Sequence, residues 1–245
     1  MYSTSLVAFG ALLVTATQVF SHPTNGTEKR ALARVYTGCT QSKTAAITFD
    51  DGPNTYTQTI VDTFNKAGGK TTFFFNGKNY NCIYDQTNAA RANCIAYMGP
   101  SSLEQPVNSQ IQSEFTRTND AIKKITGAVP AFVRPPFGEY NSNVQTIAGN
   151  LGQSLVTWDL DSQDWNGASV AQTEATYKSR LDSNPTGILA LNHEVYATSV
   201  QQVLPYVINY AKSKGYRLVT VAECVGAQPY LSRGSPSSRD GSWVC

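Results

Sequence analysis

The stretch Ile47-Thr48-Phe49-Asp50-Asp51-Gly52-Pro53 joins an apolar run to two adjacent carboxylates and a Gly-Pro turn. Charged groups at the mouth of a buried strand cost free energy unless a partner or a ligand uses them. Neighbouring residues of an extended segment point to opposite sides, so we expect one carboxylate to hold a metal while the other faces a water as general base. The alternative is an ordinary strand-ending turn, because Asp and Gly are common in turns.

From this stretch to the end of the expected domain, apolar runs rich in strand-forming residues alternate with segments that show a helical hydrophobic period. The clearest helical pattern is Ser109–Thr126, where Ile111, Phe115 and Ile122 fall on one face. Alternation over the whole length predicts a parallel α/β fold, and an α/β barrel is its simplest closure. The expected strands are Ala45–Phe49, Thr71–Phe75, Ala131–Val133, Ser154–Trp158, Ile188–Leu191 and Tyr216–Thr220, and the expected helices are Thr57–Ala67, Ser109–Thr126, Asn143–Leu151, Val170–Leu181 and Val200–Lys214.

Unusual polar and aromatic residues follow four of these expected strands. In α/β barrels the chemistry lies on loops at the C-terminal ends of the strands, so the four strand ends predict one common site. The residues are Asp50 and Asp51 after the first strand, Arg134-Pro135-Pro136-Phe137-Gly138 after the third, Asp159, Asp161, Asp164 and Trp165 after the fourth, and His193 after the fifth.

Two of these residues suit charge pairing within such a site. Arg134 precedes two prolines and is always charged, so beside Asp50 it would keep that carboxylate ionised and oriented. Asp164 could bind His193, set its tautomer and raise its pKa so that the imidazole can donate a proton. The alternatives are a surface arginine on a turn and a histidine satisfied within the core.

Three further features suit contact with a substrate. Backbone N–H groups in the Phe137-Gly138 turn could form an oxyanion site. Trp165 and Leu191 would wall a small apolar pocket, although either side chain could equally belong to the core.

Composition and charge narrow the functional class. The 245 residues carry a formal charge of +2 and only 15% charged residues, without the basic runs that nucleic-acid or membrane-surface proteins carry. The length suits one domain. Five cysteines suit an oxidising compartment, and Cys39 and Cys224 are placed to tie the two ends of the domain together. The odd count leaves at least one thiol unpaired or intermolecular.

The first residues predict export. Leu6–Val19 is an apolar stretch too short and too weakly apolar for a good membrane span, which suggests a signal peptide over residues 1–21. Residues 22–36 form either a removable pro-segment or a linker. Their polar stretch ends in the basic pair Lys29-Arg30, and Asn25 begins a glycosylation pattern. We expect one domain over 37–226 and a flexible tail over 227–245, which is rich in Ser, Gly and Arg.

The motifs together resemble the polysaccharide deacetylases of carbohydrate esterase family 4, the NodB homology domain, and especially fungal chitin deacetylases. The resemblance covers roughly Thr37 to Val225. Its five matching stretches are Thr48-Phe49-Asp50-Asp51-Gly52-Pro53, Thr71-Thr72-Phe73-Phe74-Phe75-Asn76-Gly77, Arg134-Pro135-Pro136-Phe137-Gly138 with Phe where Tyr is usual, Asp161-Ser162-Gln163-Asp164-Trp165, and Leu189-Ala190-Leu191-Asn192-His193.

The resemblance implies a distorted (β/α) barrel and a metal-dependent hydrolysis of N-acetyl groups on chitin or chitin oligomers. It implies Asp50 as general base, Asp51 as a ligand of a divalent metal, zinc or cobalt, and His193 as the acid that Asp164 orients. Arg134 would position Asp50. The substrate site would include Trp165 and Leu191 around the acetyl methyl, with Phe137 and Pro136 beside them. A secreted monomer that binds neither nucleic acid nor membrane is expected.

The second motif of the family departs from the pattern. It supplies two metal-binding histidines four residues apart, but this chain has two histidines in all, His22 and His193. One alignment places Met98 and Ser102 at the ligand positions, and another places Ala96 and Pro100 there. Neither pair suits zinc well.

Three interpretations of this departure remain open. The chain is a working deacetylase with an altered metal site, or a non-catalytic relative that binds chitin. In the third interpretation the sequence is misread around residues 85–108, and the true protein carries both histidines.

Overall fold

The computed structural model describes residues 32–85, 94–97 and 108–245. The expected signal peptide, the glycosylation pattern at Asn25, and both Met98 and Ser102 lie outside the described residues. Within the described ranges, no helix is long and apolar enough to cross a membrane.

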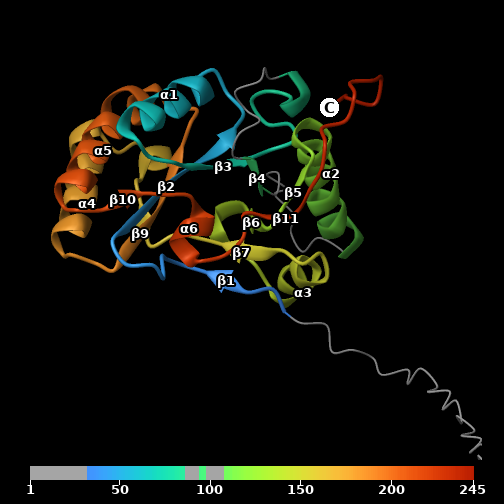
Figure 1. Ribbon diagram of the computed structural model, residues 1–245, viewed down its shortest axis with the longest axis horizontal. Coiled ribbons are helices and arrows are strands. Elements are labelled where there is room, and N and C mark those ends of the chain that lie inside the picture. Colours follow the sequence, from blue (N-terminus) through green and yellow to red (C-terminus); the bar gives the residue numbers. More distant parts are fainter. Residues whose placement is uncertain (1–31, 86–93, 98–107) are drawn as a thin grey trace, which may run out of the picture.

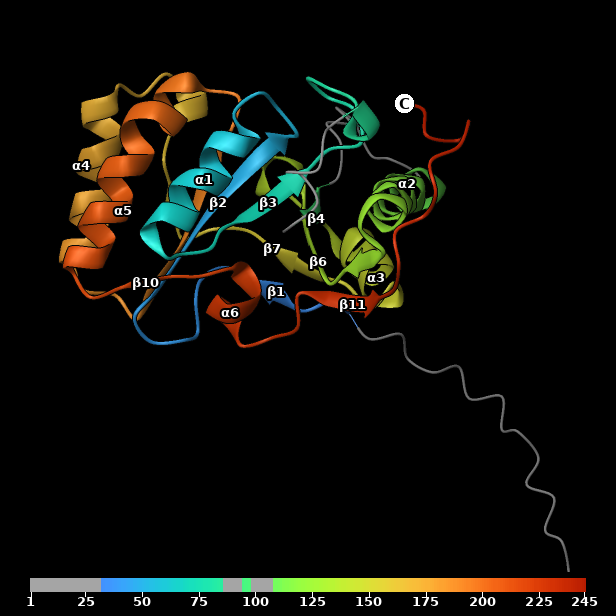
Figure 2. The ribbon, with the colours of Figure 1, turned by 45° about the horizontal axis from the view of Figure 1, so that its top comes forward.

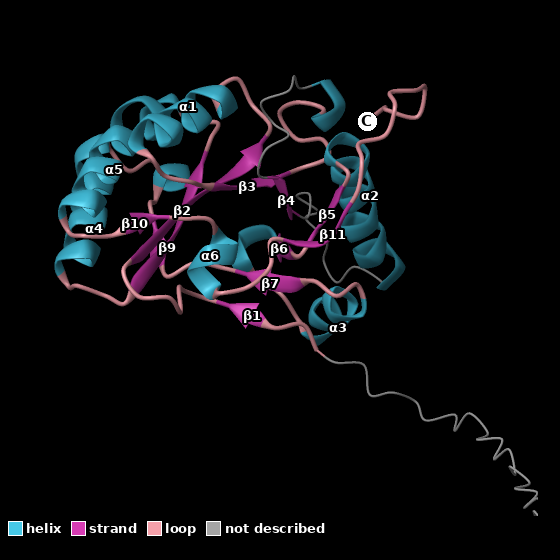
Figure 3. Cartoon of the chain, in the orientation of Figure 1, coloured by secondary structure: helices cyan, strands magenta, loops and turns pink. Residues whose placement is uncertain are grey.

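A large parallel sheet forms the centre of the molecule (Figures 1 and 3). Every strand pair in it is parallel. The pairing among the described strands runs β1-β7-β6-β4-β3-β2-β9-β8, with β10 also paired to β2. The strands are β1 (Val35–Tyr36), β2 (Thr44–Gly52), β3 (Thr72–Phe75), β4 (Cys94–Tyr97), β6 (Phe132–Arg134), β7 (Ser154–Val156), β8 (Leu160–Asp161), β9 (Gly187–His193) and β10 (Arg217–Leu218).

Helices pack around this sheet. In Figure 1, α1, α4 and α5 lie together on one side of the molecule, and α2 and α3 lie on the opposite side. This arrangement is the expected α/β architecture, because parallel strands need helical crossovers that cover the sheet. The helices are α1 (Thr57–Ala67), α2 (Asn108–Thr126), α3 (Ser142–Asn150), α4 (Val170–Asp182), α5 (Leu204–Ser213) and α6 (Val221–Val225), and short helical turns occur at η1 (Ile83–Asp85), η3 (Pro136–Gly138), η4 (Asp164–Asn166) and η5 (Ser199–Val203).

The central pair β2 and β9 is buried along almost its whole length. Apolar side chains on both faces explain this burial, since the two strands read as nearly continuous hydrophobic runs. The pair stays in register from Thr44 beside Gly187 to Asp50 beside His193. Consequently the two strands end together, and their last residues lie at the same edge of the sheet.

Residues 227–245 correct one expectation. We expected a flexible tail, but Tyr230–Arg233 forms strand β11, which pairs antiparallel with β5 (Ala128–Pro130). From there the segment runs along α2 towards η1 (Figure 2) and ends in a disulfide between Cys245 and Cys82. The predicted bridge between Cys39 and Cys224 is confirmed as a second disulfide. A disulfide and a strand pairing thus hold residues 227–245 in place, although their composition is typical of a flexible tail.

Candidate active site

The predicted strand ends meet around one cavity of about 400 Å³. Asp50 lies near the end of β2, His193 ends β9, and the loops after β6 and β8 contribute to the walls. One site at the C-terminal ends of the strands therefore brings together most of the residues that the sequence singled out. The lining residues are Asp50, Asp51, Asn79, Pro135, Phe137, Trp158, Trp165, Leu191, His193 and Tyr196.

A buried ion pair lies at the floor of this site. Nη1 of Arg134 is 2.7 Å from Oδ1 of Asp50, and the side chains are 0% and 3% exposed. Burial raises the pKa of Asp50 to about 6, although the positive charges of Arg134 and His193 act to lower it. The loss of hydration outweighs the attraction of the guanidinium, but a carboxyl with a pKa of about 6 is still mostly ionised at neutral pH.

Arg134 is fixed by more than Asp50. Its Nη1 donates to Oγ1 of Thr48 at 2.7 Å, and its Nη2 donates to the carbonyl of Thr157 at 3.0 Å. The guanidinium also lies 4.0 Å from the centre of the Phe74 ring, where a cation–π attraction stabilises the charge. These contacts hold the Asp50 carboxylate in one orientation.

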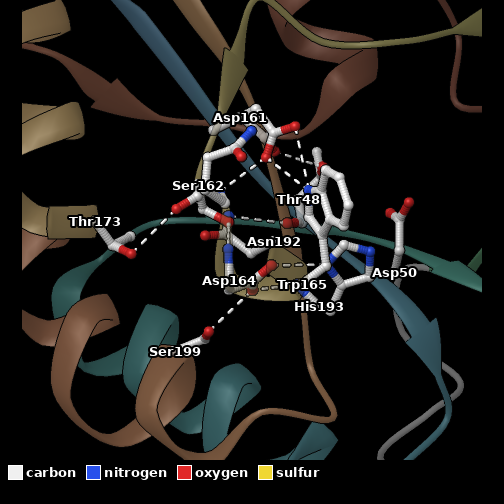
Figure 4. Close-up of polar contacts among 12 residues, drawn as sticks. Thr48, Asp50, Asp161, Ser162, Asp164, Trp165, Thr173, Asn192, His193 and Ser199 are labelled. Carbon is white, nitrogen blue, oxygen red and sulfur yellow. Dashed lines mark hydrogen bonds and ion pairs between the residues drawn. The ribbon is translucent and has the colours of Figure 1, made fainter. Parts of the chain in front are cut away.

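A second carboxylate holds His193. Nδ1 of His193 is 2.7 Å from Oδ1 of Asp164, and the backbone N–H of His193 donates to Oδ2 at 2.8 Å. Ser199 donates its hydroxyl to the same Oδ2 at 2.9 Å (Figure 4). Burial acts to lower the pKa of His193, but the hydrogen bond and the charge of Asp164 outweigh it and raise the pKa. The protonated imidazole is thereby favoured, and Nε2 is left for the cavity.

The backbone at Asp51 departs from the extended form that we expected. Asp51 has φ of +68°, and the pairing of β2 with β3 shifts register between Asp50 and Gly52. This bulge places both carboxylates on the cavity wall, rather than on opposite sides of the strand. Nδ2 of Asn76, at the end of β3, donates to Oδ1 of Asp51 at 3.2 Å.

A third acid, Glu194, lies beneath this bulge and was missed by the sequence reasoning. Glu194 is fully buried, and its Oε1 accepts a hydrogen bond from Oγ1 of Thr57 at 2.7 Å. Burial raises the pKa of Glu194 to about 8. A side chain on Gly52 would overlap the Glu194 carboxyl, so the Asp-Asp-Gly sequence allows this acid to sit directly against β2.

The turn after β6 forms another wall. The ring of Phe137 is 74% exposed, on a backbone with φ of +58°. Gly138 has φ of +73°, and a Cβ there would lie 2.8 Å from the Trp158 ring. Pro135 lines the cavity at the place where we expected Pro136. The N–H of Gly138 donates to the carbonyl of Pro135 at 3.0 Å, so it serves the turn rather than the expected oxyanion site.

Aromatic rings complete the walls. Trp165 is 52% exposed, and its Nε1 donates to Oδ1 of Asp161 at 3.2 Å. Leu191 is 3% exposed and faces the same cavity. The sequence reasoning missed Trp158 and Tyr196 as lining residues, although Trp158 ends an expected strand and an aromatic residue in that place was a usable signal.

Asp159 belongs elsewhere, although it follows the same expected strand as Asp164. Its Oδ2 is 2.9 Å from Nη2 of Arg180 on α4, and its Oδ1 accepts the N–H of Leu189 at 2.7 Å. Asp159 is therefore tied to α4 and β9.

The donor set of the described residues does not make a zinc site. In residues 32–85, 94–97 and 108–245, no three side chains of His, Cys, Asp or Glu come together in a way that could hold a metal. Asp51 is the one predicted ligand among them, and protein zinc sites take three or four ligands. The other predicted positions, Met98 and Ser102, fall outside the described ranges.

Comparison with known proteins identifies the family. A family model described as polysaccharide deacetylase matches residues 37–156. A chitin deacetylase of Pestalotiopsis sp is 31% identical over 201 residues, which are 78% of this chain and 67% of the relative. A probable peptidoglycan-N-acetylglucosamine deacetylase of Arthroderma benhamiae is 30% identical over 217 residues, 83% of this chain and 49% of that protein. The chain thus spans 67% of the length of the first relative and 49% of the length of the second.

The fold agrees with solved structures of such enzymes. The chitin deacetylase from the fungal pathogen Colletotrichum lindemuthianum superposes with a TM-score of 0.75 at 26% identity, over 81% of this chain and 94% of that chain. The expected fold class, an α/β distorted (β/α) barrel, is confirmed. On the motifs, the fold and these relatives, the chain belongs to the polysaccharide deacetylase family.

Proposed function

We propose that this protein hydrolyses N-acetyl groups of N-acetylglucosamine units in chitin or chitin oligomers, releasing acetate and leaving free amines. The observation that carries the proposal is the pair of anchored groups at one cavity: Asp50 held by Arg134, and His193 held by Asp164. The chitin deacetylases among the relatives favour chitin as the polymer. A peptidoglycan substrate is the nearest alternative, because of the second relative.

Each residue has a role in this reaction. Asp50 takes a proton from a water whose oxygen bonds to the acetyl carbonyl carbon. The bond between that carbon and the nitrogen then breaks, and His193 gives its proton to the leaving amine. Asp164 keeps His193 protonated and oriented, and Arg134 orients Asp50. Trp165 and Leu191 would hold the acetyl methyl group, with Phe137 along the sugar.

A second candidate function is chitin binding without catalysis. The observation that favours it is the lack of the family's two second-motif histidines, because the sequence contains only His22 and His193. Deacetylases of this family are generally metal-dependent, and loss of metal assistance removes several kcal/mol of transition-state stabilisation. The proposed cofactor, zinc or cobalt, would need ligands besides Asp51. Against this candidate stands the intact acid–base machinery, which a protein that only binds sugar does not need.

The setting of the protein is also a proposal. The two disulfides favour an oxidising compartment, which suits secretion to the cell surface or cell wall, where chitin is found. We propose that the chain acts there as a monomer, with residues 1–21 as its signal peptide, residues 22–36 as a pro-segment or linker, and residues 37–226 as the deacetylase domain.

The deciding experiment measures acetate release from N-acetylglucosamine oligomers, with calorimetric binding of the same oligomers. We expect release that EDTA abolishes and zinc restores, and that Asp50→Asn abolishes while binding persists. Binding without release at any zinc concentration would favour the chitin-binding candidate. Folded protein that neither binds nor releases acetate would overturn both functions, and release by Asp50→Asn at the parental rate would refute the assigned base.

A further inference from the structure

Residues 227–245 form a segment that we call the clasp. Beyond β11, the N–H of Ser237 donates to the carbonyl of Lys124 on α2 at 2.9 Å. Nη1 of Arg239 donates to the carbonyl of Tyr84 at 2.9 Å, and the ring of Trp243 lies 5.4 Å from the Tyr84 ring. The clasp ends in the Cys82–Cys245 disulfide. It therefore joins α2 to the segment that follows β3 (Figure 2).

That segment, residues 76–85, which we call the rim loop, touches the site in three places. Asn76 donates from Nδ2 to Oδ1 of Asp51 at 3.2 Å and from its backbone to the carbonyl of Gly52 at 2.8 Å. Asn81 donates from Nδ2 to the carbonyl of Pro53 at 3.2 Å. Asn79 lines the cavity. The rim loop thus contacts Asp51, Gly52 and Pro53 in succession and supplies part of the wall.

The rim loop borders a second cavity on the side that faces α2 and the clasp. Ile83 and Tyr84 are buried, but a cavity of about 270 Å³ lies between the start of the loop and α2. The sides of this cavity include Gly77 and Lys78 from the loop and Arg117 and Thr118 from α2. Val244 and Cys245 of the clasp also line this cavity, so on this side the clasp contacts the rim loop directly as well as through the disulfide.

We propose that the clasp is a positioning element of the site. Through Cys82 it fixes the rim loop, and through Asn76, Asn79 and Asn81 the rim loop fixes the bulge at Asp51 and one wall of the cavity. The inference rests on the proposed function, because it assigns the clasp to the same carbohydrate site. A cross-link restricts the alternative conformations of the segment that it closes, so its removal should loosen the loop and the bulge together.

The chain offers a matched control in its other disulfide. Cys39 lies at the opposite end of the sheet, where its Sγ is 3.0 Å from the carbonyl of Ile188 near the start of β9. The site lies at the other end of β9, at His193. A double variant Cys39→Ser/Cys224→Ser therefore removes a disulfide without touching the rim loop, whereas Cys82→Ser/Cys245→Ser releases the clasp.

The first measurement is hydrogen–deuterium exchange on the two double variants and the parent. In Cys82→Ser/Cys245→Ser we expect exchange at least about fivefold faster in residues 76–85 and 50–57, because local opening requires less free energy. The control should leave both segments as in the parent. Parental exchange of residues 50–57 in the clasp variant would overturn the inference, because the disulfide would then stabilise the clasp alone.

The second measurement is calorimetric binding of an N-acetylglucosamine tetramer. In the clasp variant we expect the affinity for the tetramer to be about tenfold weaker. This value corresponds to a fall in the binding-competent loop conformation to about a tenth of the population. Equal affinity in the clasp variant and the parent would refute the inference and leave the proposed function standing. Failure of the parent to bind refutes the proposed function instead, while the exchange data still decide whether the clasp positions Asp51.

A single substitution tests the same link if the clasp variant fails to fold. Asn81→Ala removes the hydrogen bond to the carbonyl of Pro53 and leaves both disulfides and the cavity wall in place. We expect faster exchange in residues 50–57 together with weaker tetramer binding. Parental values for both would refute the coupling between the rim loop and the bulge.

Discussion

Arg134 and Asp50 show how much this site depends on single side chains. Both are almost completely buried, so each charge has lost its hydration and relies on the other. The sequence predicted this pairing from the strand ends alone. It could not predict the raised pKa of Asp50, because that shift comes from burial, and only the folded chain leaves the Asp50 side chain 3% exposed.

Replacing Arg134 should therefore destabilise the protein strongly. Arg134→Ala leaves Asp50 buried without its counter-ion, and we expect a loss of about 3–5 kcal/mol in the free energy of unfolding. Urea unfolding at neutral pH measures it. The matched control is Arg180→Ala, whose ion pair with Asp159 is partly exposed and should cost less than about 1 kcal/mol. Equal losses in the two variants would contradict this account.

The pKa of His193 should set the alkaline limit of the reaction. Asp164 raises that pKa above the ordinary 6.5, so the protonated imidazole persists to a higher pH and is lost as the pH rises through the folded-state value. Asp164→Asn should lower the pKa and move the alkaline limb of acetate release to lower pH. NMR titration of the imidazole checks the shift without relying on activity, and an unchanged titration would refute the role of Asp164.

Glu194 should make stability depend on pH in the opposite sense to an ordinary acid. Its pKa rises from 4.5 to about 8 on burial. Between these values the folded state keeps a proton that the unfolded state has lost, so the free energy of unfolding falls as the pH rises. The side chain in Glu194→Gln is neutral at every pH, so this variant should lose this contribution to the slope of the free energy of unfolding against pH. Urea unfolding of both proteins across the window measures it, and parallel slopes would refute it.

At the scale of single elements, the site depends most on the bulge at the end of β2. A regular strand would have sent Asp50 and Asp51 to opposite faces, whereas the bulge brings both to the cavity. Gly52 allows this arrangement because it leaves room for Glu194 and the Phe75 ring. The bulge was not predictable from the sequence, since it appears only in the pairing of β2 with β3, a strand that lies beyond α1 along the chain.

Adding one methyl group at this element should disturb it. In Gly52→Ala the new Cβ meets the Glu194 carboxyl and the Phe75 ring, and overpacking of this kind costs about 1–3 kcal/mol. Thermal or urea unfolding gives the measurement. Gly241→Ala is the control, because open space surrounds a Cβ there, and the change should stay within about 0.5 kcal/mol. A parental stability for Gly52→Ala would refute the tight packing.

The long helices were well predicted by the sequence, whereas two of the shortest strands, β1 and β8, were not expected at all. The expected helix Thr57–Ala67 matches α1, and the expected strand Ile188–Leu191 lies within β9. The helix carries enough residues for a hydrophobic period to be visible, and the strand shows as a continuous apolar run. The strands β1 and β8 contain two residues each, too few for any period. Pairing with neighbouring strands creates them.

At the scale of the whole molecule, two disulfides tie the polypeptide to itself at separate places. Cys39–Cys224 joins residues 185 apart, and Cys82–Cys245 joins residues 163 apart. Sequence position suggested the first, because the two cysteines flank the predicted domain. The second was hidden, since residues 227–245 have a polar composition typical of a free tail, and only the folded structure brings Cys245 near Cys82.

The Cys39–Cys224 bond should contribute stability without serving the site. Closing so long a loop restricts the unfolded chain, and its loss typically costs roughly 2–5 kcal/mol. We expect Cys39→Ser/Cys224→Ser to lose that amount in urea unfolding while it keeps the parental affinity for an N-acetylglucosamine tetramer. Weakened binding in a folded variant would show that this bond also supports the cavity.

The same bond has a consequence for how the molecule withstands damage. Because Cys39 is linked to Cys224, the polypeptide between them is a closed ring rather than a line. A protease that cuts a surface loop once within this ring opens the ring but releases no fragment. The two pieces of such a nicked molecule stay covalently joined, and under denaturing conditions they separate only when a reductant is added.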